Sequence, residues 1–360
     1  MAIDGIALYD LTTKSFVELP VKLVEMQRNC IRRVSDTEFA LIAVAVDSPK
    51  SLYIVDVTKP SEKKLLKTSA DVDVPASILS KAETITFPRT HGQELGTSSY
   101  AMYCPPYNPD FEAPAQSKPP LIVWIHGGPT SRAGAGLDMQ GLQATQYFTS
   151  RGYAFVSTNY AGSTGYGRAY RDSLNFSWGI KDVEDSISCI DYLASKGLVD
   201  GDKVGIAGQS SGGYTVLQAM CTYPKVFAAG CSLFGIGNLK TICEDTHKFE
   251  SHYGFALLFP PEATEEEQEK VFYDRSPCFH CDKIERPLVL LQGDQDKVVP
   301  IGQAEEMEKV LKAKGADVKL VVFKGEGHGW AMKESVKRTI EEMEALWKRT
   351  LLLNVVVAKR

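Results

Sequence analysis

The sequence has 360 residues, of which 44% are hydrophobic and 24% charged, a composition typical of a globular protein with room for one large domain and a smaller one. A net charge of −5 offers no positive potential for nucleic acids or anionic membranes, so we expect neither as a partner. The N-terminus has early acidic residues and no continuous apolar core, and no apolar run approaches the roughly 18 residues of a membrane helix. These features predict a cytoplasmic protein.

Residues 1–80 contain short runs with the composition of β-strands, separated by turn-forming segments such as Asp47–Lys50. The runs cover 6–10, 39–45 and 51–56, at the close spacing of an antiparallel meander. A piece of this size buries little apolar surface by itself. We therefore expect a β-rich appendage that packs against the rest of the chain.

A proline-rich loop over 105–120 marks a boundary, beyond which strand and helix patterns alternate. The strand runs are short and continuously apolar, as in strands buried on both faces of a parallel sheet. The predicted strands cover 121–125, 153–157, 204–207, 288–291 and 320–323, and the predicted helices cover 183–193, 213–221, 304–314 and 335–351. This alternation predicts a doubly wound, mostly parallel α/β sheet in residues 81–352, followed by a C-terminal tail, 353–360.

The first strand of this predicted sheet ends in a glycine turn, His126-Gly-Gly-Pro129, whose backbone amides are exposed. Such amides bind anions, either a phosphate group or the oxyanion of an acyl-transfer reaction. The chain has neither a GxGxxG fingerprint nor a P-loop lysine, which favours the oxyanion interpretation.

The strand 204–207 leads through Gly208-Gln-Ser210-Ser-Gly212 directly into a predicted helix. Small residues on both sides of the serine allow a sharp turn that exposes its Oγ, and the helix N-terminus favours developing negative charge. Serine is also a common helix N-cap, which is the purely structural alternative. The strand–turn–helix context favours a nucleophile, with the amide of Ser211 and one from the glycine turn after the first strand as oxyanion donors.

The eight cysteines have no repeated spacing, and one CxxC pair occurs at Cys278 and Cys281. A structural zinc site needs four soft ligands, usually from two such pairs, and no second pair is present. A redox pair would begin a helix after a strand, whereas this one follows Ser276-Pro277 in a loop-like stretch. We expect reduced cysteines and no metal or organic cofactor.

The last two predicted strands end in glycine-rich turns that carry two acids, Asp294 and Asp296, and then His328. Both turns follow the carboxyl ends of strands, where open α/β sheets carry their sites. The order serine, acid, histidine is that of the α/β-hydrolase fold, which we therefore predict, with Ser210 as nucleophile and His328 as general base.

Asp296 is the preferred acid because the following Val298-Val-Pro300 can anchor its loop, while its rival Asp294 adjoins the strand end and can cap the turn. A solvated loop histidine is the alternative for His328. Its flanking glycines and the following Trp330 favour a packed loop instead.

These features and several longer motifs resemble the prolyl oligopeptidase family of serine peptidases, specifically its acylaminoacyl-peptidase branch. The motifs are His126–Pro129, Asn159–Gly167, Gly208–Tyr214, Asp245–Glu250, Gly293–Pro300 and Glu326–Gly329, and the resemblance covers roughly 83–350. It implies Ser210, Asp296 and His328 as the triad and Gly128 and Ser211 as oxyanion donors. The expected lining of the substrate pocket is His126, Tyr160, Tyr214 and Trp330.

The chain also departs from this family. Members usually carry a complete β-propeller before the hydrolase domain, whereas residues 1–80 resemble only a remnant of one. Acidic residues that hold a free amino terminus in dipeptide-releasing relatives belong to the missing part, so dipeptide release is not expected. His126 stands where some relatives place an oxyanion-binding tyrosine.

The resemblance implies hydrolysis of amide or ester bonds in short peptides or acylated small molecules through an acyl-enzyme. The alternatives are a small-molecule esterase, acyltransferase or cyclase with the same triad, and a non-catalytic remnant, against which the intact triad counts. An open strand edge left by a missing propeller makes a homodimer a further expectation.

Overall fold

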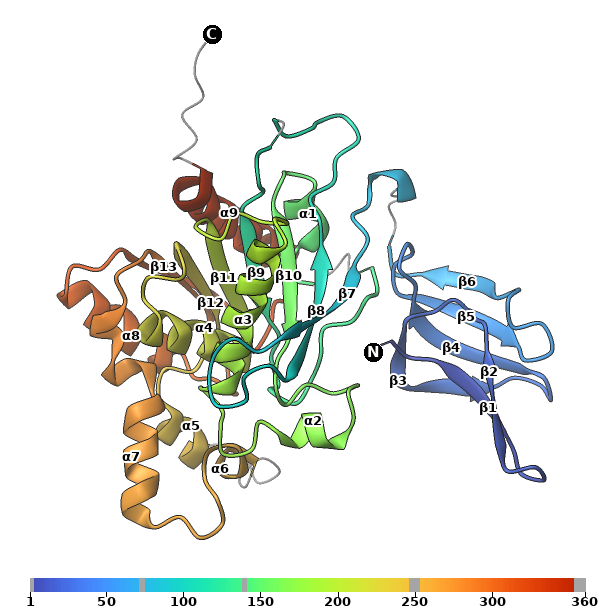
Figure 1. The fold of residues 1–360 in the computed structure, drawn as a ribbon, viewed down its shortest axis with the longest axis horizontal. Helices are drawn as coiled ribbons and strands as arrows, with labels where there is room; N and C mark the ends of the chain where they lie inside the picture. Colours follow the sequence, from blue (N-terminus) through green and yellow to red (C-terminus); the bar gives the residue numbers. More distant parts are fainter. Residues whose placement is uncertain (1–2, 71–74, 115, 138–140, 246–252, 353–360) are drawn as a thin grey trace.

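The computed structural model describes residues 3–70, 75–114, 116–137, 141–245 and 253–352. The predicted tail 353–360 and all but the first residue of the motif Asp245–Glu250 lie outside these ranges. A small group of N-terminal strands lies beside a larger domain in which helices surround a sheet (Figure 1).

The larger domain is built on one eight-stranded sheet, in the order β14-β13-β12-β11-β9-β10-β8-β7. Strands β9 to β14 run parallel, and β8 and β7 are added antiparallel at one edge. The strands are β7 (Glu83–Pro88), β8 (Ser98–Cys104), β9 (Leu121–Ile125), β10 (Ala154–Asn159), β11 (Val204–Gln209), β12 (Ala229–Leu233), β13 (Leu288–Gly293) and β14 (Val318–Phe323). This is the α/β-hydrolase fold, as predicted.

Helices cover both faces of the sheet, and their apolar sides form two separate core clusters. The first cluster includes α3 (Lys181–Ser195), α4 (Ser211–Thr222) and α8 (Gly302–Ala313). The second includes α1 (Thr145–Thr149) and α9 (Lys333–Trp347), which continues as a π-helical turn, Lys348–Leu352. The two-layered covering explains why the central strands are continuously apolar.

Shorter elements fill the connections. They are the helices α2 (Arg168–Asp172), α5 (Leu239–Asp245), α6 (Tyr253–Leu258) and α7 (Glu265–Arg275) and the 3₁₀ turns Ala76–Ile78, Pro277–Phe279 and Cys281–Lys283. The CxxC cysteines lie in the last two turns as free, buried thiols, and burial raises the pKa of the Cys278 thiol to about 12.

Two sequence expectations about the sheet need correction. The strand 320–323 was expected to be buried on both faces, but β14 is the edge strand and Val322 is 45% exposed. The sequence patterns also missed β7 and β8, which precede the proline-rich loop 105–120 and yet belong to this sheet, and β12, because Ala229-Gly-Cys-Ser-Leu233 is short and carries few large apolar side chains.

The N-terminal part is an antiparallel four-stranded sheet, β3-β4-β5-β6, with a hairpin, β1-β2. The strands are β1 (Ile6–Asp10), β2 (Ser15–Leu19), β3 (Glu25–Arg33), β4 (Glu38–Val44), β5 (Ser51–Asp56) and β6 (Lys64–Thr68). It has a small core of its own. It docks through an ion pair of Asp4 with Arg132 at 2.6 Å and through the Leu137 amide, which donates to the Ala45 carbonyl at 2.9 Å.

No helix in the described ranges is both long and apolar enough to cross a bilayer. The edge strand β6 is exposed along its whole length, which is the kind of edge that prompted the expectation of a homodimer. Dimerisation stays a prediction.

Candidate active site

Ser210 occupies the turn between β11 and α4, at φ 56° and ψ −123°, a strained conformation for a non-glycine residue. Two glycines make this turn possible. A Cβ on Gly208 would lie 2.6 Å from the carbonyl oxygen of Gly212, and one on Gly212 would lie 2.1 Å from that of Ile125. Ser210 makes no side-chain capping hydrogen bond, so the N-cap alternative is wrong and its hydroxyl is free for another partner.

That partner is His328, whose Nε2 lies 2.9 Å from the Ser210 Oγ. The opposite ring nitrogen, Nδ1, lies 2.8 Å from Oδ2 of Asp296. A carboxylate only accepts hydrogen bonds, so Nδ1 carries the proton and Nε2 is left to accept from the serine. The three side chains that the sequence singled out are thus brought together in one hydrogen-bonded chain.

Asp296 is held from several directions. Its Oδ1 accepts the backbone amides of Val298 and Val299, each at 2.9 Å, and its Oδ2 also accepts from Gln292 at 3.2 Å. Burial opposes ionisation, but the bonds from His328 and these amides outweigh it, so the pKa of Asp296 lies below its usual value. Asp296 is therefore a buried carboxylate, suited to orient a histidine.

The rival acid points elsewhere. Asp294 Oδ1 accepts the Gly325 amide at 2.7 Å and so caps the neighbouring turn. The structure thus separates two acids that are only two residues apart in the sequence.

Phe234, which the sequence analysis did not single out, packs against the His328 ring with centroids 4.7 Å apart. It has φ 39° and directly follows β12, the strand that the sequence patterns missed. Trp330 packs behind it in a T-shaped contact at 5.2 Å. The sequence signal that could have identified Phe234 is the short run of small residues, 229–233, followed directly by Phe234-Gly235.

The turn at the end of β9 lies against the nucleophile. A Cβ on Gly127 would lie 3.0 Å from the Gln209 carbonyl oxygen and 3.4 Å from the Ser210 Cβ, and Gly128 has φ 132°, so a side chain would be crowded at the first position and strained at the second. The amides of Gly128 and Ser211, the predicted oxyanion donors, donate to no other group among the described residues. Both are therefore available to a substrate oxygen.

Ser210 and His328 open onto a cavity of about 580 Å³, a volume suited to a small ligand. The N-terminal part also lines this cavity, through residues that include Glu25, Val44 and Lys50. Local sequence patterns could not predict this contribution, because it depends on how the two parts dock. The appendage therefore completes the site.

The expected pocket lining needs correction. Of the four predicted residues, only His126 lines the cavity, and both of its ring nitrogens already have protein partners. Tyr160 and Tyr214 are fully buried, with Tyr214 donating to the Arg275 carbonyl, and Trp330 packs behind Phe234. Tyr160 and Tyr214 therefore belong to the core of the domain and not to the wall of the cavity.

Comparison with known proteins agrees with this architecture. The chain matches the prolyl oligopeptidase family over residues 140–353. It is 31% identical to dipeptidyl aminopeptidase BIII of Pseudoxanthomonas mexicana over 226 residues, which cover 62% of this chain and 32% of that protein. It is 30% identical to the acylamino-acid-releasing enzyme of Arabidopsis thaliana over 219 residues, 58% of this chain and 27% of that protein.

Among solved structures, a puromycin-hydrolyzing peptidase of Mycobacterium tuberculosis superposes with a TM-score of 0.88 at 35% identity, covering 96% of this chain and 51% of that one. An acylaminoacyl peptidase of Pyrococcus horikoshii shares the fold at 21% identity and a TM-score of 0.75, covering 96% of this chain and 52% of that one. The chain thus spans about half the length of these structures and about a third of the curated relatives. From its fold and its match over more than half its length, the chain belongs to the prolyl oligopeptidase family of serine peptidases.

Proposed function

We propose that this protein is a serine hydrolase that cleaves amide or ester bonds of short peptides or acylated small molecules through an acyl-enzyme. The observation that carries the proposal is the continuous chain from Ser210 Oγ through His328 to Asp296, with distances of 2.9 and 2.8 Å, at the wall of a cavity. The order of the hydrogen bonds is the one that a serine–histidine–acid triad uses.

In the proposed mechanism, His328 Nε2 takes the Ser210 proton as Oγ bonds to the substrate carbonyl carbon. The carbonyl oxygen becomes an oxyanion that accepts hydrogen bonds from the Gly128 and Ser211 amides. Protonated His328 then gives its proton to the departing amine or alcohol, and the acyl group stays on Oγ. Water, deprotonated by His328, hydrolyses this ester and restores the hydroxyl.

Relatives support the substrate class. One relative is named for releasing acylamino acids and one for hydrolysing puromycin, and a cavity of about 580 Å³ suits a small substrate. We place the primary activity on N-acylated amino acids. A cytoplasmic location is part of the same proposal.

Fluorophosphonate labelling tests whether the site is competent. Wild-type protein should label at Ser210, and Ser210→Ala and His328→Ala should not label, while their circular dichroism spectra match that of the wild type. If the folded wild-type protein stays unlabelled, the proposal is refuted and the non-catalytic alternative is the one that remains.

Substrate comparison then separates the two catalytic alternatives. An N-acetyl-amino-acid p-nitroanilide requires protonation of a poor leaving group, whereas a p-nitrophenyl ester does not. Hydrolysis of both supports the peptidase-like function. Turnover of the ester alone would favour a small-molecule esterase or acyltransferase.

A further inference from the structure

One sequence motif has no role in the site described so far. The segment Asn159–Gly167 follows β10 and runs beside the turn at the end of β9. The Asn159 side chain accepts from the amide and donates to the carbonyl of Ala133, at 2.7 and 3.0 Å. The Thr164 amide donates to the Ser131 carbonyl at 2.8 Å. The two segments are thus held together at both ends.

Between these ends, the segment holds His126. The Tyr160 hydroxyl donates to the His126 carbonyl at 2.9 Å, and the Tyr160 ring stacks on the imidazole at 4.4 Å with 16° between the planes. The Ser163 hydroxyl lies 2.9 Å from His126 Nε2. We call His126, Tyr160 and Ser163 the histidine clamp.

The remaining ring nitrogen of His126, Nδ1, lies 2.8 Å from the carbonyl oxygen of Gly127. A carbonyl oxygen only accepts, so Nδ1 carries the proton and donates, and Nε2 accepts from Ser163. The ring is buried, and burial lowers the pKa of His126 to about 4, which keeps it in this neutral state. Both ring nitrogens are therefore occupied by protein partners, Nε2 by Ser163 of the clamp and Nδ1 by the Gly127 carbonyl.

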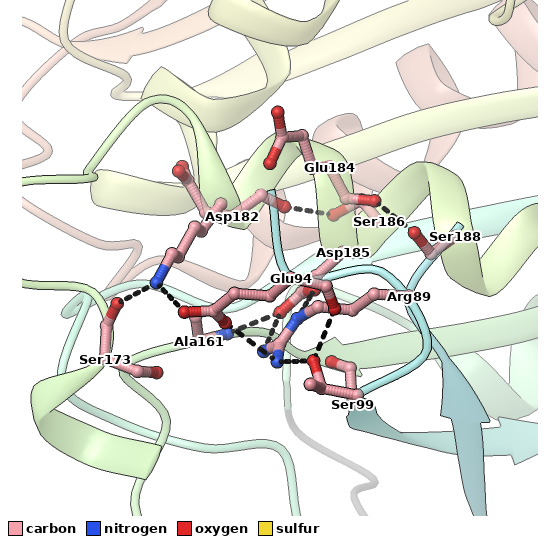
Figure 2. Close-up of polar contacts among 12 residues, drawn as sticks. Arg89, Glu94, Ser99, Ala161, Ser173, Asp182, Glu184, Asp185, Ser186 and Ser188 are labelled. Carbon is pink, nitrogen blue, oxygen red and sulfur yellow. Dashed lines mark hydrogen bonds and ion pairs between the residues drawn. The ribbon is translucent and has the colours of Figure 1, made fainter. Parts of the chain in front are cut away.

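The clamp is anchored on its far side. The amide of Ala161 donates to Asp185 at 2.8 Å, and Asp185 forms a buried ion pair with Arg89 at 2.6 Å. Figure 2 shows Ala161 and Arg89 meeting at Asp185 on α3. The Tyr160–Ser163 segment is thus tied to the body of the domain, away from the cavity.

The hydrogen bond from His126 to the Gly127 carbonyl also determines the direction of the next N–H group, because the peptide bond is planar. The carbonyl of Gly127 and the amide of Gly128 belong to one peptide unit, in which the C=O and N–H vectors point in opposite directions. A hydrogen bond that fixes the Gly127 carbonyl therefore also fixes the direction of the Gly128 N–H. This amide is one of the two proposed oxyanion donors.

We propose that His126 is a positioning residue, which holds the peptide between Gly127 and Gly128 so that its N–H faces the substrate oxygen at Ser210. Ser163 donates to Nε2 and, together with the stacked Tyr160, fixes the orientation of the ring. The inference rests on the proposed function, because it assigns the Gly128 amide its role in stabilising the oxyanion.

Three variants test the clamp against a matched control. His126→Phe keeps a ring for stacking on Tyr160 but has no donor, and His126→Asn keeps a donor near the position of Nδ1. Ser163→Ala removes the hydroxyl that donates to Nε2 and helps to fix the ring orientation. The control, His91→Phe, changes a more exposed histidine that also contacts a tyrosine ring, Tyr223.

We expect His126→Phe to lower kcat on an N-acetyl-amino-acid p-nitroanilide by about 10- to 100-fold with KM within about twofold, since misplaced oxyanion donors cost transition-state binding. His126→Asn should retain most of kcat. An N-acetyl-amino-acid aldehyde, which adds to Ser210 and forms an oxyanion, should lose affinity in parallel with kcat, whereas the corresponding alcohol should not. His91→Phe should match the wild type.

A folded His126→Phe with wild-type kcat, or with raised KM and unchanged kcat, would overturn the inference, since the second result marks a substrate contact. Should His126→Phe not fold, Ser163→Ala carries the test, with an expected loss in kcat of about three- to tenfold for one hydrogen bond. Wild-type kcat in Ser163→Ala would then overturn it. Failure of the wild type itself to label or hydrolyse would refute the function and the clamp together, whereas an active wild type isolates the clamp.

Discussion

Replacing Asp296 by Asn tests the proposed acid most directly, because Asn is the same size but offers one acceptor and one donor. Oδ1 of Asp296 accepts two backbone amides at 2.9 Å, so the Asn oxygen keeps that position. Its NH₂ group then faces His328 Nδ1, which must accept instead of donating. The ring proton moves to Nε2, and Nε2 can no longer take the proton of Ser210.

The expected loss in kcat is about 10⁴-fold, which corresponds to about 5 kcal/mol in the activation free energy. The flipped Asn would point its NH₂ group at two N–H donors, so neither orientation restores the site. Initial rates on an N-acetyl-amino-acid p-nitroanilide measure the effect, with circular dichroism to show that the variant folds.

Asp294→Asn is the matched control. Its carbonyl oxygen can still accept the Gly325 amide, so we expect kcat within about twofold of the wild type. A folded Asp296→Asn that keeps more than about a tenth of wild-type kcat, or an Asp294→Asn that loses as much as Asp296→Asn, would refute the assignment of the acid.

Three further changes follow from the structure. Gly212→Ala places a Cβ 2.1 Å from the Ile125 carbonyl oxygen, and we expect it to lower the free energy of unfolding by about 1–3 kcal/mol in urea titrations and to abolish hydrolysis. Asp185→Asn removes the buried charge partner of Arg89 and leaves it only the more exposed Glu94, at 3.3 Å, with an expected cost of about 3 kcal/mol in the same assay. Burial lowers the pKa of His126 to about 4, below the 6.5 of an unperturbed histidine, so the unfolded state binds the extra proton between these values. The free energy of unfolding should therefore fall as pH decreases from 6.5 to 4, by up to about 3 kcal/mol more in the wild type than in His126→Asn.

Each of these has a control or a contradicting result. Gly302→Ala adds a Cβ with no atom within 4 Å and should leave stability unchanged, so equal losses at both glycines would argue against the steric explanation. Asp36→Asn removes an exposed ion pair with Arg33 and should cost at most about 1 kcal/mol. Parallel pH curves for the wild type and His126→Asn would show that His126 does not titrate as described.

The local patterns of the sequence were sufficient for the fold class and for the order of the site residues. Continuous apolar runs identified every parallel strand except β12, and glycines around Ser210 identified the sharp turn, because both signals depend only on residues close together in the chain. The nucleophile, the acid and the histidine follow strand ends, and parallel strands bring those ends to one edge of the sheet. Their meeting could be predicted without knowledge of a single contact.

Local patterns could not decide the features that depend on long-range pairing. Strand β14 is partly exposed because it lies at the edge of the sheet. Strand β12 forms between β11 and β13 although its own residues give only a weak strand signal. Asp294 and Asp296 are only two residues apart; the sequence favoured Asp296, and the path of the turn then places it against His328 and turns Asp294 to the Gly325 amide.

The same holds for the surroundings of the nucleophile. Tyr160 and Tyr214 belong to the sequence motifs, but their side chains are buried in the core. Glu25 and Lys50 are far from the motifs in sequence, and yet they line the cavity. The sequence by itself determined which chemical groups this protein carries and the edge of the sheet at which they gather. The tertiary structure alone decided which side chains face them, because side-chain direction depends on how helices, turns and the N-terminal sheet pack together, and no local period encodes that packing.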